Sequence, residues 1–67
     1  MKVNPDRFIM AKAKACMSNA DIQALAKVSS VSLARIRNGE GEPRPQTVGR
    51  LAKALGVTVE YLVGEVQ

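Results

Sequence analysis

The sequence is poor in the residues that most catalytic and metal sites require. Its 67 residues include one cysteine, no histidine and no tryptophan. Cys16 alone cannot form an intramolecular disulfide, which excludes the cross-linked framework of a small secreted domain and fits a reducing cytoplasm. With no histidine, one thiol and no acidic pair at useful spacing, His/Cys metal sites and nucleophile–base pairs lack their components. We therefore expect no enzymatic activity, no metal and no cofactor.

Aromatic residues and long apolar runs are also scarce. Phe8 and Tyr61 are the only aromatics, so the chain lacks a stacking platform for single-stranded nucleic acid, and we expect both in the core. No run approaches the roughly 18 apolar residues of a membrane span, and Met1 to Asp6 lacks the apolar stretch of a signal peptide. We expect a soluble, cytoplasmic protein.

The hydrophobic residues that are present are mostly small and aliphatic. They make up 46% of the chain, mainly as Ala, Val, Leu and Ile, which suits closely packed short helices. A chain of this length buries only about 60% of the surface that it exposes when unfolded, so it supports one core. We expect a single domain over residues 1–67.

The net charge of +4 is unevenly distributed. Residues 1–38 carry seven basic against two acidic side chains, a net +5, whereas residues 39–67 carry three against four, a net −1. The first part should therefore face any polyanionic partner, although a basic half can also be no more than a solvated face.

Capping residues and glycines divide the chain into five predicted helices, at about residues 5–16, 18–26, 29–37, 45–55 and 58–63. Asn4-Pro5 and the Ser18/Asp21 pair are helix starts, and Asn38-Gly39 is a left-handed terminator. Such short helices need one another, which predicts a compact all-α fold. The residues expected to face inward are Phe8, Ile9, Ala13, Cys16, Ile22, Leu25, Ala26, Leu33, Ile36, Val48, Leu51, Ala52, Leu55, Val59 and Leu62. We expect Cys16 to be a buried small hydrophobe rather than a redox sensor.

The third helix has an outward face suited to a DNA groove. Val31 and Arg35 are i, i+4 neighbours, each roughly 160° from Leu33. A valine beside an arginine matches the thymine methyl and the guanine O6/N7 edge that a major groove displays. The alternative is a scattered surface hydrophobe beside a solvated charge.

The run from Ser18 to Gly39, then Pro43, then the block from Leu51 to Leu62, resembles the Cro/phage-repressor (Xre-like) helix-turn-helix family of bacterial and phage transcriptional regulators. The most specific parts are the Val-Ser opening of the third helix, the Arg-Ile-x-Asn-Gly at its close and the Leu-Ala-Lys-Ala-Leu-Gly-Val-Thr block. The resemblance covers roughly Phe8 to Gly64. It implies a lambda-repressor-like five-helix domain that binds double-stranded DNA, with the third helix entering the major groove.

The resemblance also implies roles for individual residues. Base contacts fall on Ser30, Val31, Ser32 and Arg35. Phosphate contacts fall on Asn19, Asn38 and Arg44, to which we add Arg37. The implied mode is a homodimer, acting as a repressor, that places two Arg35-bearing helices about 34 Å apart on a palindromic operator. Dimer contacts are expected from the last helix and tail, at Val59, Tyr61, Leu62, Val63 and Val66.

Departures from the family pattern qualify this interpretation. Gln23 stands where a small Ala is usual, and Lys27 stands where the turn usually has Gly. At positive φ a lysine carries strain on the order of 1 kcal/mol, so we expect a non-standard turn. Lys12 and Arg37 occupy positions where the family often has an Arg–Glu bridge, so the Lys12 ammonium must extend outward or find another partner.

The loop after Gly39 carries two acidic residues where basic ones commonly meet phosphate. Glu40 and Glu42 predict either weaker DNA binding or a loop turned away from DNA, unless they are ion-pair partners of Arg37 and Arg44. They also keep open a second function, a protein-interaction module such as an antitoxin or a polymerase-docking regulator. A third interpretation is the N-terminal domain of a larger repressor.

Overall fold

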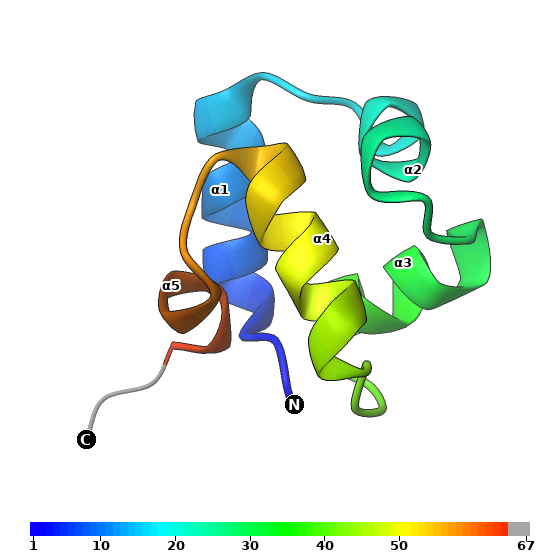
Figure 1. The fold of residues 1–67 in the computed structure, drawn as a ribbon, viewed down its shortest axis with the longest axis vertical. Coiled ribbons are helices and arrows are strands. Elements are labelled where there is room, and N and C mark those ends of the chain that lie inside the picture. Colours follow the sequence, from blue (N-terminus) through cyan, green and yellow to red (C-terminus); the bar gives the residue numbers. More distant parts are fainter. Residues whose placement is uncertain (65–67) are drawn as a thin grey trace.

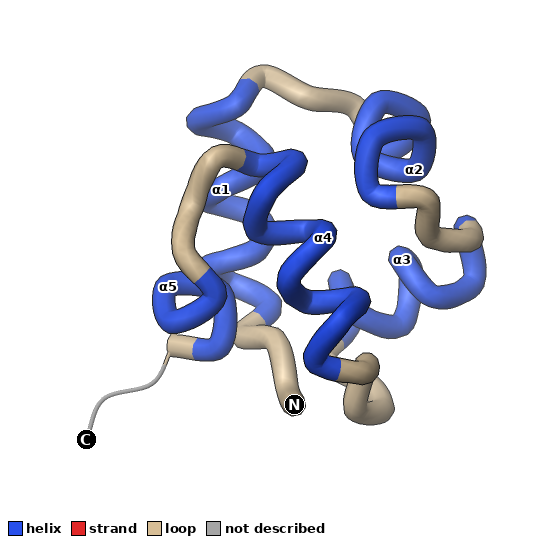
Figure 2. Tube along the Cα trace, in the orientation of Figure 1, coloured by secondary structure: helices blue, strands red, loops and turns tan. Residues whose placement is uncertain are grey.

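The computed structural model describes residues 1–64, which form five helices joined by short loops (Figures 1 and 2). The helices are α1 (Pro5–Ala15), α2 (Asn19–Ala26), α3 (Ser30–Asn38), α4 (Pro45–Leu55) and α5 (Val59–Val63). This part of the chain contains no strand, so the predicted all-α class is confirmed. The bounds differ from the expected ranges by one residue at five places. Cys16, Ser18, Ser29 and Thr58 are caps rather than helical residues, and α3 extends one residue further, to Asn38.

Side-chain caps explain where α1, α2, α3 and α5 begin. The Asn4 carboxamide oxygen accepts hydrogen bonds from the backbone N–H groups of Asp6 and Arg7 at 2.9 and 3.2 Å. At α2 the Ser18 hydroxyl accepts from the Asp21 N–H at 3.1 Å, while the Asp21 carboxylate accepts from the Ser18 N–H at 3.0 Å. The Ser18 backbone, and secondly its side chain, thereby lower the pKa of Asp21 below its ordinary value. The predicted capping box is present.

Helix α4 lies at the centre of the fold, with α2 and α3 on one side and α5 on the other, and it crosses in front of α1 (Figure 1). The four residues of α4 that were predicted to face inward are all buried, and so are Leu33 and Ile36 of α3. The buried core consists of Val3, Phe8, Ala11, Ile22, Ala26, Leu33, Ile36, Val48, Leu51, Ala52, Leu55 and Leu62.

The inward face predicted for α1 is wrong except at Phe8. Ile9 is 51% exposed, and both Ala13 and Cys16 are exposed. Phe8 and Ala11 define the buried face instead, and at about 100° per residue Ile9, Ala13 and Cys16 form a separate stripe beside it. Cys16 is thus not buried; it is the left-handed C-cap of α1, with φ 55°.

Helices α2 and α5 contain further corrections. Leu25 was expected inward with Ile22 and Ala26, but it is 62% exposed because those two residues take the face toward α4. Val59 and Tyr61 are only half-buried, and the Arg7 guanidinium carbon lies 5.0 Å from the centre of the Tyr61 ring.

The N-terminal segment belongs to the packed structure, which the sequence did not indicate. Val3 is 2% exposed, and the Asn4 N–H donates to the Leu62 carbonyl oxygen at 2.8 Å. The Met1 ammonium donates to the Pro43 carbonyl oxygen at 3.2 Å. Within residues 1–64, no helix has the length and apolar character needed to cross a membrane.

Candidate nucleic-acid interface

A three-residue turn, Lys27 to Ser29, joins α2 to α3. Lys27 adopts the left-handed conformation, with φ 56° and ψ 47°, and its N–H donates to the Gln23 carbonyl oxygen at 2.9 Å. Ser29 then caps α3 by accepting from the Ser32 N–H at 3.1 Å. We expected a non-standard turn that avoids this strain, but Lys27 adopts the left-handed conformation itself, at a cost on the order of 1 kcal/mol.

The rotation of α3 about its axis is fixed by its two buried residues. Leu33 and Ile36 anchor the inner face, at 4% and 3% exposure. Val31 on the opposite side is 63% exposed, and Arg35 one turn later is also exposed. The helix thus presents a methyl-bearing side chain and a guanidinium side by side, as the sequence predicted.

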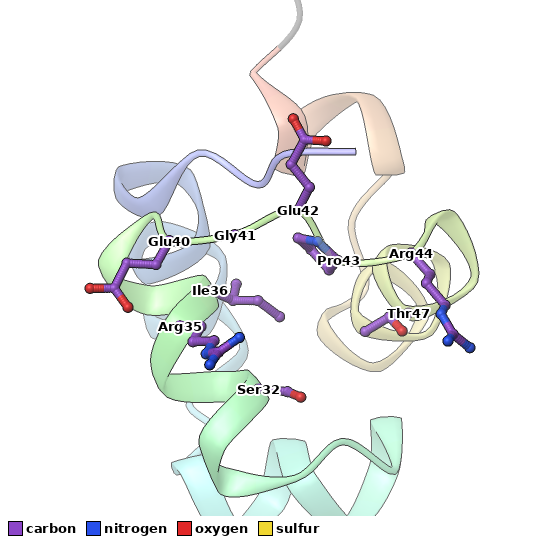
Figure 3. A pocket seen from close by; sticks show the side chains of 9 residues that line it. All are labelled: Ser32, Arg35, Ile36, Glu40, Gly41, Glu42, Pro43, Arg44 and Thr47. Carbon is purple, nitrogen blue, oxygen red and sulfur yellow. The ribbon is translucent and has the colours of Figure 1, made fainter.

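Two hollows flank α3. The first, of about 350 Å³, lies between α3 and the start of α4 and includes Ser32, Arg35, Arg44 and Thr47 in its lining (Figure 3). The second, of about 100 Å³, lies toward α2 and includes Asn19, Ser30 and Arg37. Six of the eight predicted DNA-contacting residues therefore line one hollow or the other, on both sides of the same helix. Val31 and Asn38 line neither, and both are exposed.

A lysine holds the start of α2. The Lys12 ammonium donates to the Asn19 side-chain oxygen at 2.6 Å, so this cation finds a partner on α2, one of the two outcomes that we expected. With its oxygen engaged, Asn19 keeps its amide N–H₂ group as a donor, the group that a phosphate oxygen would accept from.

The start of α4 carries donors that sequence reasoning missed. Arg44 is the N-cap and makes no side-chain cap hydrogen bond, and Pro45 follows it as the first helical residue. An N-cap without an acceptor leaves the first backbone N–H groups of the helix, those of Gln46 and Thr47, without a capping partner. The signal lay in the Arg44-Pro45 pair, because arginine cannot cap as Ser or Asp does.

The two acidic residues of the loop do not pair with the neighbouring arginines as we considered. Figure 3 shows the Glu42 carboxylate directed away from the Arg44 guanidinium. Glu40 lines the hollow next to α4, whereas Arg37 lines the one next to α2. Both carboxylates are exposed, so their charges add to the field that a polyanion would meet at the first hollow.

Two helices joined by a short turn, the second anchored inside and exposed outside, define a helix-turn-helix unit. A family model described as helix-turn-helix matches residues 12–62, from α1 to α5. The chain belongs to this helix-turn-helix family, of the Cro and C1 type, which is a family of DNA-binding transcription regulators and not of enzymes. DNA is therefore its partner. No curated protein and no solved structure matched the chain.

Proposed function

We propose that the protein is a repressor that reads a palindromic operator as a homodimer, with α3 in the major groove. The observation that carries this proposal is the outward pair on α3, a 63% exposed Val31 beside an exposed Arg35, above an inner face that is buried. In this arrangement Arg35 donates a bidentate pair to guanine O6 and N7, and Val31 covers a thymine methyl. Ser30 and Ser32 contribute hydrogen bonds with little selectivity.

Residues on both sides of α3 supply the contacts that position the domain on the sugar-phosphate backbone of DNA. Asn19 and Arg37 lie on the α2 side, and Arg44 lies on the α4 side. Asn38 is exposed at the end of the helix. The α4 N–H groups next to Arg44 add donors at the positive end of a helix dipole, an arrangement that favours phosphate. These contacts fix register without reading sequence.

The assignment of roles is tested by pairing Arg35→Ala with Arg44→Ala. Sites selected from random DNA supply the operator, and binding is measured on it and on unrelated duplex. Arg35→Ala should lose about 1–3 kcal/mol at one base position, whereas Arg44→Ala should weaken all sequences alike and reduce the salt slope by about one. Equal losses of specific and nonspecific binding in both variants would contradict the proposal.

The salt dependence separates this function from a protein-interaction module. The logarithm of the operator binding constant should fall steeply and linearly with the logarithm of salt concentration, because phosphate contacts release condensed counterions. Affinity for a protein partner held by apolar contacts should hardly change. If the chain does not bind duplex DNA, or binds it with little dependence on salt, the protein-interaction module is favoured.

The dimer contact is proposed on α5 and the N-terminal segment. Val59 and Val63 are half-buried and line an open hollow of about 480 Å³ with Met1, which is 46% exposed. Tyr61 is half-buried beside Arg7. Leu62, expected in the dimer contact, is 0% exposed and belongs to the core, so that expectation is wrong. Val66 lies outside the described residues.

The oligomeric state tests the dimer directly. Val63→Asp should yield a monomer in sedimentation and should bind a full operator without cooperativity. Val57→Asp is a matched control, because Val57 is also half-buried but does not line this hollow; this variant should dimerise as the parent does. A parent chain that is monomeric at high concentration and on DNA would remove the homodimer.

A further inference from the structure

The C-terminal end of α2 and the C-terminal half of α4 form a second exposed surface, which the DNA interface does not use. Leu25 is 62% exposed there, next to Ala26 and Ala54, and the open hollow around them measures about 470 Å³. Three cations, Lys27, Arg50 and Lys53, complete its lining. We call these six residues the Leu25 groove.

The Leu25 groove faces away from the proposed DNA interface. At about 100° per residue, Leu25 points roughly 160° from Gln23 and 120° from Asn19, the α2 residues that line the hollow beside α3. No residue of the Leu25 groove lines either hollow that flanks α3. A molecule seated in the groove would leave α3 free to occupy DNA.

The chemistry of the groove defines its occupant. Its lining includes three cations and no acid, and the nearby Asp21 carboxylate is held by the Ser18 N–H. A second copy of the chain would bring the same cations against one another in a two-fold interface, so the groove is not self-complementary. A nucleic-acid backbone would satisfy the cations but leave Leu25 in water.

We propose that the Leu25 groove docks an acidic amphipathic helix of another protein. Such a helix would pack an apolar residue on Leu25 between α2 and α4, in the helix-in-groove mode. Its flanking carboxylates would meet Lys27, Arg50 and Lys53. The site gives a DNA-bound regulator a place to contact a protein partner, and its existence does not depend on the role of Arg35.

A synthetic peptide tests the proposal. The probe is a 16-residue helix with Leu at i, i+4 and i+7 and Glu on both flanks, titrated into the ¹⁵N-labelled full chain at low salt. The largest amide shifts should fall on the Leu25 groove, with and without duplex DNA bound. A matched peptide with Lys in place of Glu should not bind.

Two variants and a control complete the test. Leu25→Ser should weaken peptide binding by roughly tenfold or more, since it removes most of a leucine contact. Lys53→Glu should also weaken it. Lys14→Glu makes the same charge change on α1, where the lysine nitrogen lies 6.0 Å from the Tyr61 ring centre, and should bind the peptide as the parent does. Circular dichroism checks that each variant is folded.

Three results would overturn the proposal. The first is no shift at millimolar peptide, and the second is equal binding of the Lys peptide. The third is a loss of nonspecific duplex affinity and of salt slope in Lys53→Glu, with peptide binding unchanged, which would make the groove a phosphate-binding surface. Leu25→Ser should keep the parent's affinity for DNA throughout.

Discussion

Gly39 ends α3 and lies against the first turn of α1, so replacing it tests how α3, the proposed recognition helix, packs on the domain. The glycine has φ +75°, and a Cβ built on it would lie 2.8 Å from Cγ of Pro5. Alanine at positive φ costs about 1 kcal/mol. A carbon–carbon separation normally exceeds about 3.5 Å, and the Pro5 ring cannot rotate away, so overpacking adds roughly 1–3 kcal/mol.

Gly56 supplies a matched control. It has nearly the same φ, +73°, and nothing lies within 4 Å of its built Cβ. Gly56→Ala should therefore cost only the backbone term, about 1 kcal/mol. The unfolded-state entropy change of a Gly→Ala replacement is common to both variants and cancels in their difference.

The expected losses are large against the total stability. A domain of this size is stable by roughly 3–10 kcal/mol, and each kcal/mol shifts Tm by about 4–8 °C. Gly56→Ala should lower Tm by about 4–8 °C, and Gly39→Ala by about 8 °C at least, followed by circular dichroism in thermal and urea unfolding. Equal losses in the two variants would refute the contact between Gly39 and Pro5 as a source of the difference.

Three further predictions concern the turn, the cap and the loop. Lys27→Gly should leave Tm unchanged or raise it slightly, because glycine at φ 56° relieves on the order of 1 kcal/mol of strain while its greater unfolded-state entropy costs about 0.4–1 kcal/mol; a clearly lower Tm would contradict strain at Lys27. Asp21→Asn should lower Tm at pH 7. The depressed pKa of Asp21 means that its stabilising contribution is present above the unfolded value of about 3.8 and is lost as pH falls below it. Parent and variant should therefore converge toward pH 2, and a constant difference from pH 2 to 7 would contradict the capping role. Glu42→Gln should tighten duplex binding roughly 1.5- to 5-fold at low salt and negligibly at high salt, measured by fluorescence anisotropy; no change at low salt would place the loop away from DNA.

Features encoded by neighbouring residues were predictable from the sequence. Caps at Ser18, Ser29 and Thr58 depend on side chains within three residues of the N–H groups that they satisfy. The outward face of α3 could be predicted because Leu33 and Ile36 are the large apolar residues that must face the core, and this fixes the rotation of the helix about its axis.

Features set by distant packing were not predictable in the same way. In α1, two apolar stripes compete, and Phe8 with Ala11 is chosen because α3, α4 and α5 pack against that side. The Lys12 contact with Asn19 depends on how α1 meets α2. The uncapped start of α4 becomes part of the candidate site only because α4 places it beside Arg35.

The hydrogen bond from Asn4 to Leu62 has a consequence for synthesis of the protein. It joins the residue before α1 to a residue of α5, which emerges from the ribosome after the other four helices. Until then α1 lacks the contacts that it makes with α5. The first helix to be synthesised is thus among the last to be fully packed. A nascent chain stalled before Leu62 should be readily degraded by proteases.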